Sequence, residues 1–256
     1  MIIILLFIIG AIAGSLMNVC IYRMPRKESI ISPRSHCPSC GKTIRWHDNI
    51  PVISFLLLRG KCRYCKAGIS PRYVMVEVLS GLVCVFLFLR FGITWNFFKF
   101  FYLLNSLIVV SFIDFKTHEI PDSITISGIL IGLLLAVLYP VLTGNSALID
   151  SLVNSFLGVI AGGGSIYILG FIGEFIFKKE AMGGGDVKLL AMIGAFVGWK
   201  LAIFIFFAAP FFGVIPGIVL KLKQKRDVIP YGPYISLAAF VAIFWGETII
   251  KKIFLI

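Results

Sequence analysis

MIIILLFIIGAIAGSLMNVCIY, residues 1–22, is an apolar run without a charged side chain. As a helix rising about 1.5 Å per residue it reaches roughly 33 Å, enough to cross the ~30 Å hydrocarbon core of a bilayer. No basic residue precedes the run, and Arg23 follows it. This pattern is typical of a retained first membrane span with its N-terminus outside, and not of a cleaved signal peptide.

The rest of the chain is similarly apolar. Of its 256 residues 59% are hydrophobic and only 14% are charged, and the mean hydropathy is +1.00. A soluble domain could not bury that much apolar surface. We therefore predict an all-α polytopic membrane protein with about eight transmembrane helices, near residues 2–22, 73–91, 97–115, 124–142, 152–177, 187–199, 201–220 and 234–250. Glycines within the spans, such as Gly10 and Gly14, predict close helix contacts.

The net charge of +12 raises the question of a nucleic-acid partner. With the N-terminus outside, 19 of the 24 lysines and arginines fall in segments predicted to lie inside. This distribution is the positive-inside bias of membrane loops. We therefore expect the lipid bilayer as a partner and no nucleic acid, in a multi-pass protein of the cytoplasmic (inner) membrane.

One segment differs from the spans. Residues 23–72 form a predicted cytoplasmic insert between the first transmembrane helix (1–22) and a transmembrane bundle (73–256). The insert contains four of the six cysteines and 11 basic residues, which would help hold it at anionic lipid headgroups. Within it NIPVISFLLLRG (49–60) is apolar but too short to span, so it is interpreted as a core strand or a membrane-surface segment.

Two C-x-x-C pairs, Cys37/Cys40 and Cys62/Cys65, are separated by 21 residues. Four thiolates on two tight turns form the closed tetrahedral shell of a structural zinc ion. Gly41 and Gly68 would suit those turns. Two disulfides disagree with a reducing cytoplasmic compartment, and redox chemistry is the remaining alternative. A shell with no open position indicates that the zinc does not perform catalysis.

Two aspartates are predicted to meet at the inner face of the membrane. Asp114 lies near the inner end of the span 97–115, and Asp186 opens the span 187–199, which starts on the same side. Two close carboxyl groups can share one proton, so that one activates water while the other protonates a carbonyl oxygen. Because Asp186 lies at a helix N-terminus with Lys188 near it, we expect Asp186 to be the ionised member and Asp114 to hold the proton.

Other residues are candidates for supporting roles. Glu77 is interpreted either as a hydrogen-bonded structural acid or as a substrate contact. Asp122, and as an alternative Asp186, could be helix N-caps, which aspartate favours. Gly184 and Gly185 would let a substrate backbone approach closely, and tight helix packing is the alternative. Acids gathered on one face favour an enzyme over a cation-coupled transporter, which needs acids at several depths.

These segments together resemble the bacterial type IV prepilin peptidases, which are G-x-G-D membrane aspartic proteases. The resemblance rests on GSLMNVCIYRMP (14–25), both C-x-x-C pairs, DFKTHEIPD (114–122) and MGGGDVKLLAMIGAFVG (182–198), in the expected order. It implies that Asp114 and Asp186 are the catalytic pair. It also favours this family over other G-x-G-D proteases that cut within the membrane.

The resemblance further implies a substrate and a second activity. The substrates would be the basic leader peptides of type IV prepilins and pseudopilins, cut on the cytoplasmic side. Bifunctional members then methylate the new N-terminus from S-adenosylmethionine, and the intact tetracysteine insert is a mark of such members. No strand followed by G-x-G-x-x-G is present in the insert, so no methyl-donor site is assigned.

Overall fold

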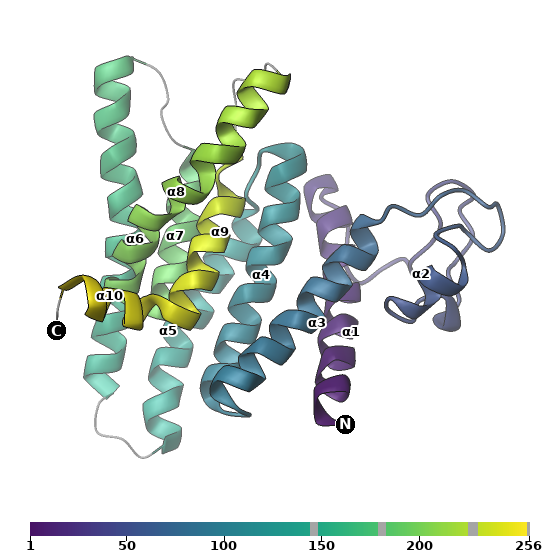
Figure 1. Cartoon of the computed structure of the whole chain (residues 1–256), viewed down its shortest axis with the longest axis horizontal. Coiled ribbons are helices and arrows are strands. Elements are labelled where there is room, and N and C mark those ends of the chain that lie inside the picture. Colours follow the sequence, from purple (N-terminus) through teal and green to yellow (C-terminus); the bar gives the residue numbers. More distant parts are fainter. Residues whose placement is uncertain (144–147, 179–182, 225–229, 255–256) are drawn as a thin grey trace. The chain divides into compact units, whose positions relative to one another are not determined.

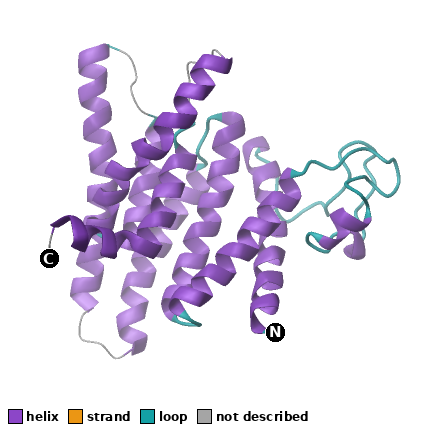
Figure 2. Cartoon of the chain, in the orientation of Figure 1, coloured by secondary structure: helices purple, strands orange, loops and turns teal. Residues whose placement is uncertain are grey.

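The computed structural model describes residues 1–143, 148–178, 183–224 and 230–254. Helices dominate the described residues, which contain no strand beyond two isolated β-bridges (Figure 2). In chain order the elements are α1 (Ile2–Arg23), η1 (Met24–Arg26), η2 (Trp46–Asp48), α2 (Ile53–Leu57), α3 (Arg72–Phe91), α4 (Trp95–Thr117), α5 (Asp122–Thr143), α6 (Leu148–Phe177), α7 (Gly184–Val197), α8 (Trp199–Gln224), α9 (Gly232–Val241), η3 (Ala242–Gly246) and α10 (Glu247–Phe254). Lys179, Met182, Lys225 and Arg226, which entered the sequence predictions, lie outside the described residues.

Seven stretches of the described chain are long and apolar enough to cross a membrane. They begin at Ile2, Arg72, Trp95, Asp122, Leu148, Trp199 and Gly232. The last combines α9, the π-helical turn η3 and α10 in one continuous path. The predicted all-helical membrane fold is thus confirmed. The remaining predicted span, 187–199, corresponds to α7, whose 14 residues reach only about 21 Å.

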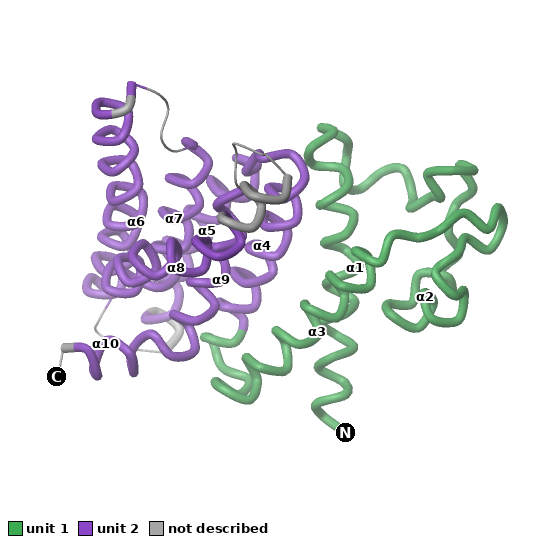
Figure 3. The backbone as a smooth tube through the Cα atoms, turned by 45° about the horizontal axis from the view of Figure 1, so that its top comes forward, with its two compact units in different colours: residues 1–97 green, residues 98–256 purple. Residues whose placement is uncertain are grey.

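The chain divides into two compact units, Met1–Phe97 and Phe98–Ile256 (Figure 3). In the first unit α1 packs along α3 through small residues. A Cβ on Gly10 would lie 2.6 Å from the Ser80 carbonyl oxygen, and one on Gly14 would lie 2.7 Å from the Glu77 Cα. The Ser80 hydroxyl donates to the Gly10 carbonyl at 2.6 Å. The predicted close contact at these glycines is confirmed.

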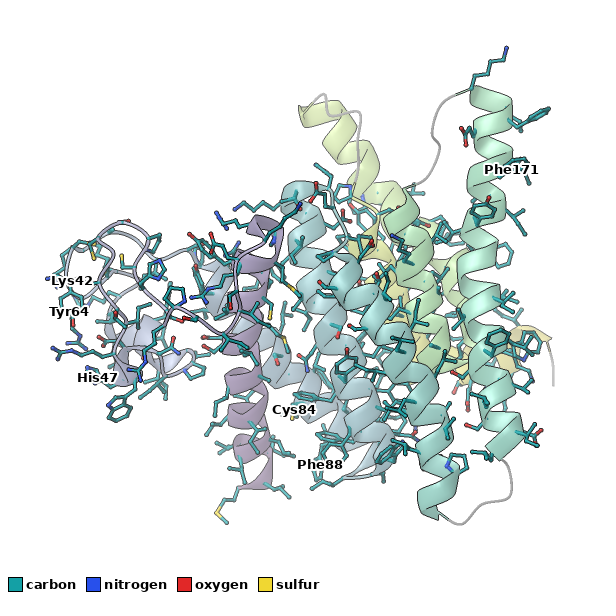
Figure 4. All side chains as sticks on the ribbon, turned by 180° about the vertical axis from the view of Figure 1, so that it is seen from behind. Lys42, His47, Tyr64, Cys84, Phe88 and Phe171 are labelled. Atoms are coloured by element: carbon teal, nitrogen blue, oxygen red, sulfur yellow. The ribbon has the colours of Figure 1, made fainter. Side chains whose placement is uncertain are left out.

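The insert consists of loops and short helical turns (Figure 2). Its apolar run forms the helix α2 rather than a core strand, so that interpretation is wrong. The described residues offer this run no partner strand, and the Ser54 amide bonds the Ile50 carbonyl at 3.0 Å in a helical turn. Around the outer part of the insert lie Lys42, Tyr64 and His47 (Figure 4).

In the second unit α7 lies among α5, α6, α8 and α9 (Figure 1). Its residues from Leu189 to Phe196 are all buried, which explains why this helix is apolar on every side. Gly158 and Gly162 of α6 face Gly194 and Leu190 of α7, and a Cβ on either α6 glycine would collide with the facing backbone. Close packing without side chains therefore holds α7, and the end that carries Asp186, in place.

Candidate active site

Asp114 lies three residues before Thr117, the last residue of α4, and only 5% of its surface is exposed. Its Oδ2 atom accepts a hydrogen bond of 2.8 Å from the backbone N–H of Gly232, the first residue of α9. A Cβ on Gly232 would lie 2.8 Å from the same oxygen. The first residue of α9, 118 residues further along the chain, thus bonds this carboxyl group. The missing side chain of Gly232 leaves room for that close approach.

Asp186 is the third residue of α7 and is half-buried. Gly183 occupies the N-cap position and its carbonyl accepts the Asp186 N–H at 3.1 Å, so the alternative that Asp186 is the cap is wrong. Burial, and then the charge of Asp114, raise the pKa of Asp186 to about 7. Burial, and then the charge of Asp186, raise the pKa of Tyr231 to about 12. The two aspartates therefore share one electrostatic neighbourhood beside the start of α9.

The contacts of the two carboxyl groups favour the opposite placement of the shared proton from the one expected. A backbone N–H pointed at Asp114 stabilises its carboxylate. Among the described residues, Asp186 has no comparable donor beyond its own turn, and its pKa is raised. The helix-end argument considered only the ends of α4 and α7, whereas burial also acts on Asp186 and Asp114 also faces the N-terminus of α9. Burial therefore favours a proton on Asp186, and the placement of the shared proton stays a prediction.

The two glycines directly before Asp186 differ in what surrounds them. A Cβ on Gly185 would lie 3.0 Å from the Ile120 side chain, so this glycine packs against the loop that follows α4. A Cβ on Gly184 would meet no described atom within 4 Å. Tight packing therefore explains Gly185, while Gly184 faces open space among the described residues.

Asp122 and Lys188 form an ion pair. The Lys188 Nζ lies 2.7 Å from the Asp122 Oδ1, and both side chains are exposed. Because α5 begins at Asp122 itself, the N-cap prediction for this residue is wrong by one position, with Pro121 before it. The pair joins the first turns of α5 and α7, each close in sequence to one of the two aspartates.

Glu77 belongs to the first unit and is 8% exposed. Its Oε2 accepts the Val52 backbone N–H at 2.7 Å, and Ser15 is a further hydrogen-bond partner. These contacts favour the structural alternative, because they join the insert to α3. A contact between Glu77 and substrate stays a prediction.

The four cysteines of the insert form one cluster. Their sulfur atoms all lie within 4.8 Å of one another, and those of Cys37 and Cys65 are 3.8 Å apart. A tetrahedral site with metal–sulfur bonds of about 2.3 Å has sulfur–sulfur edges of about 3.8 Å, so the cluster fits a metal ion. Hydrogen bonds from the backbone of Cys65 and Tyr64 lower the pKa of Cys62 to about 6, which favours its thiolate. Against a hydrogen bond from Ala67, burial and the neighbouring thiols raise the pKa of Cys65 to about 11, so the cluster does not ionise all its thiols equally without a metal.

The two cysteine pairs lie on matching turns. Cys37 and Cys62 each donate a backbone N–H to a carbonyl five residues later, on Lys42 at 2.9 Å and on Ala67 at 2.8 Å. The left-handed residue is Gly41 in the first turn, with φ 69°, and Lys66 in the second, with φ 59°. Gly68 was therefore the wrong choice for the second turn.

Sequence reasoning gave no role to Tyr231 and Gly232. The available signal was the Gly-Pro step at Gly232–Pro233, since proline favours the first turn of a helix and a glycine there admits a close neighbour. What the sequence could not show is that this helix start faces Asp114.

The fold and the two clusters define a class: a multi-pass helical membrane protein with a pair of neighbouring aspartates and a tetracysteine module. Comparison with known proteins identifies a family within this class. Residues 8–91 match the bacterial peptidase A24 N-terminal domain, and residues 101–218 match the type IV leader peptidase family.

Several relatives have the name prepilin leader peptidase/N-methyltransferase. The Myxococcus xanthus protein is 37% identical over 86% of this chain, which covers 64% of that relative's length. The proteins of Stutzerimonas stutzeri and Pseudomonas aeruginosa are 32% and 30% identical over 94% and 95% of this chain, which covers 90% of each. No solved structure matches. The chain belongs to the type IV leader peptidase family and is a membrane peptidase.

Proposed function

We propose that this enzyme removes the leader peptides of type IV prepilins and pseudopilins, with Asp114 and Asp186 as the catalytic pair. The observation that carries the proposal is the neighbourhood of the two carboxyl groups, one bonded to the Gly232 N–H and the other with a pKa of about 7. A pair in which one member is charged and the other protonated can act as base and acid at neutral pH.

The proposed reaction uses the pair in that arrangement. The Asp114 carboxylate removes a proton from a water molecule, whose oxygen attacks the scissile carbonyl carbon. Asp186 donates its proton to the carbonyl oxygen. The tetrahedral intermediate then collapses: Asp114 passes the proton it took from water to the leaving nitrogen, a hydroxyl of the gem-diol returns a proton to Asp186, and the C–N bond breaks to give the acid and the amine. Gly184 gives the substrate backbone room beside the acid, since a Cβ there meets no described atom.

The location and substrate follow from charge. We place the N-terminus outside the inner membrane and the aspartates at its cytoplasmic face, in agreement with the positive-inside bias. A leader peptide is basic, so the acids at that face are its proposed contacts, with Glu77 and Asp122 as candidates and Lys188 as the partner of Asp122.

We propose a structural zinc ion for the cysteine cluster. Cys37, Cys40, Cys62 and Cys65 would hold it, and four thiolates leave no position for water or substrate. Its contribution is to fix the two turns of the insert, where few apolar contacts are available.

A second proposed activity is N-methylation of the new N-terminus from S-adenosylmethionine, which the names of the relatives support. The insert has no strand among its described residues and no G-x-G-x-x-G, so it does not fit a Rossmann-type methyl-donor site. No residue of this chain is therefore assigned to the methyl donor.

The competing functions are a cation-coupled transporter and a protease that cuts within the membrane. A purified prepilin, incubated with the reconstituted enzyme, distinguishes them. We expect Asp114→Asn and Asp186→Asn each to lower the cleavage rate by at least ~10²-fold, the lower range for loss of general acid–base catalysis. Asp150→Asn, an exposed aspartate of α6, is the matched control and should cleave normally. Normal cleavage by either active-site variant would refute the assignment.

A further inference from the structure

The insert of the first unit has an apolar face that its own fold leaves uncovered. Ile53, Leu56 and Leu57 on α2 are 54%, 65% and 78% exposed, and Trp46 is 82% exposed. The three α2 residues are spaced i, i+3 and i+4, so they share one side of the helix. We call these four residues the α2 face.

The α2 face is a fixed part of the insert. The buried Ser54 hydroxyl accepts the Ile50 N–H and donates to the His47 carbonyl, both at 2.9 Å. This joins the turn that carries Trp46 to α2. Phe55 packs under Gly60, where a Cβ would lie 3.1 Å from its ring. The side of α2 that includes Ser54 and Phe55 therefore faces the insert, and the opposite side is left apolar and open.

A buried acid of a membrane helix sets the depth of α2. The Glu77 Oε2 accepts the N–H of Val52, the residue just before α2. Glu77 is the sixth residue of α3, about 7 Å along the axis from Arg72. The 20 residues of α3 reach about 30 Å, the thickness of the hydrocarbon core, so Arg72 lies near its edge and the anchor lies inside.

Backbone strain at Val52 indicates that its contacts fix the position of α2 relative to α3. Val52 has φ 61° and ψ −50°, a region that a β-branched residue almost never adopts. Such a conformation persists only where the surroundings fix it. The bond to Glu77 is one such constraint, and it links the strained residue to the membrane helix.

The charges around the α2 face match a lipid surface. Residues 23–72 contain 11 basic and two acidic residues, and the exposed Arg45 and Arg59 lie on either side of the face in sequence. Anionic headgroups attract basic segments, tryptophan favours the membrane interface, and interfacial helices insert about 5–10 Å deep. The depth of the Glu77 anchor falls within that range.

We propose that the α2 face inserts into the headgroup–acyl boundary of the leaflet on the insert's side, so that lipid covers it. The insert is then a membrane-embedded module fixed at a set depth beside α1 and α3, rather than a domain extending into solvent. This interaction is independent of the proposed peptidase chemistry.

Depth-dependent fluorescence quenching tests the proposal. The full chain, with Trp95, Trp199 and Trp245 replaced by phenylalanine, is reconstituted with zinc into phosphatidylglycerol vesicles containing phosphatidylcholine brominated near the headgroup or deep in the acyl chain. We expect the shallow bromines to quench Trp46 emission more than the deep ones, and acrylamide to quench it weakly. A second variant that retains only Trp245, which is 53% exposed within a predicted span, is the reference for lipid contact.

The substitution Leu56→Glu with Leu57→Glu is expected to abolish bromolipid quenching of Trp46 and to raise quenching by acrylamide. Unchanged zinc content would show that the insert still folds. Strong acrylamide quenching of Trp46 without bromolipid quenching in the parent protein would overturn the proposal. So would protection of Trp46 that arises only when a prepilin is added, because the face would then bind substrate rather than lipid.

Discussion

At the scale of single residues, Gly232 is the least expected member of the site. Its N–H donates to Asp114, and its missing Cβ leaves room for that oxygen. Gly232→Ala should lower kcat/KM by roughly 10–100-fold, in line with about 1.5–3 kcal/mol for a hydrogen bond to a charged group. The acid limb of the pH profile should move to higher pH, because the added Cβ displaces the Asp114 carboxylate from the N–H that residue 232 retains.

Gly164→Ala, a helical glycine of α6 with no described atom within 4 Å of an added Cβ, is the control for this substitution. Both variants should keep the wild-type melting temperature within a few degrees. A Gly232→Ala enzyme with an unchanged pH profile would contradict the role given to the hydrogen bond.

The raised pKa of Asp186 gives a second prediction. A carboxyl group with a pKa of about 7 retains its proton below that pH and loses it above. Because the proposed mechanism needs the protonated form, kcat/KM for prepilin cleavage should fall as the pH rises through about 7. Initial rates between pH 5.5 and 9 in reconstituted vesicles would measure this. A flat profile above pH 7 would disagree with Asp186 as the acid.

At the scale of elements, the ion pair between Asp122 and Lys188 links the starts of α5 and α7. Exposed ion pairs contribute about 0–1 kcal/mol, so Asp122→Asn or Lys188→Met should hardly change thermal stability. We expect each to lower kcat several-fold, because Asp186 is only two residues from Lys188. The exchanged pair, Asp122→Lys with Lys188→Asp, should recover part of the loss in a prepilin assay. Equal losses in all three variants would mean that the pair does not position α7.

The helices themselves were largely predictable. Long apolar runs set the spans, and paired glycines such as Gly10 and Gly14 indicated close packing, because both depend on local composition. The strand interpretation of 49–60 failed since a short apolar run has no period that separates strand from buried helix. The second metal-site turn was misassigned to Gly68 because Lys66 adopts a left-handed backbone that its residue type disfavours.

The candidate site was predictable only in part. Topology placed Asp114 and Asp186 on one face, and the structure brings them into one neighbourhood. The proton assignment required knowing what each carboxyl group touches. The donor from Gly232 comes from 118 residues away, and no local pattern around Asp114 indicates it.

At the scale of the whole molecule, the insert belongs to the unit Met1–Phe97 with α1 and α3, whereas Asp114 and Asp186 belong to the unit Phe98–Ile256. Metal binding by the insert should therefore be separable from peptide cleavage by the two aspartates. Cys37→Ser or Cys62→Ser should remove about one zinc per chain and destabilise the insert, whereas Cys84→Ser, in a buried position of α3, should keep the metal. Metal analysis of the purified proteins gives the stoichiometry. Full zinc retention after loss of Cys62 would contradict the four-thiolate site.

The catalytic pair acts as one unit in the proposed mechanism, and this can be measured with Asp114→Asn, Asp186→Asn and the double variant. Residues that act together are strongly non-additive, since removing one already abolishes the shared function. Single-turnover cleavage of one prepilin by all three reconstituted enzymes should therefore show nearly equal losses. A double variant slowed by the product of the two single effects would contradict a shared role, as would wild-type cleavage by either single variant.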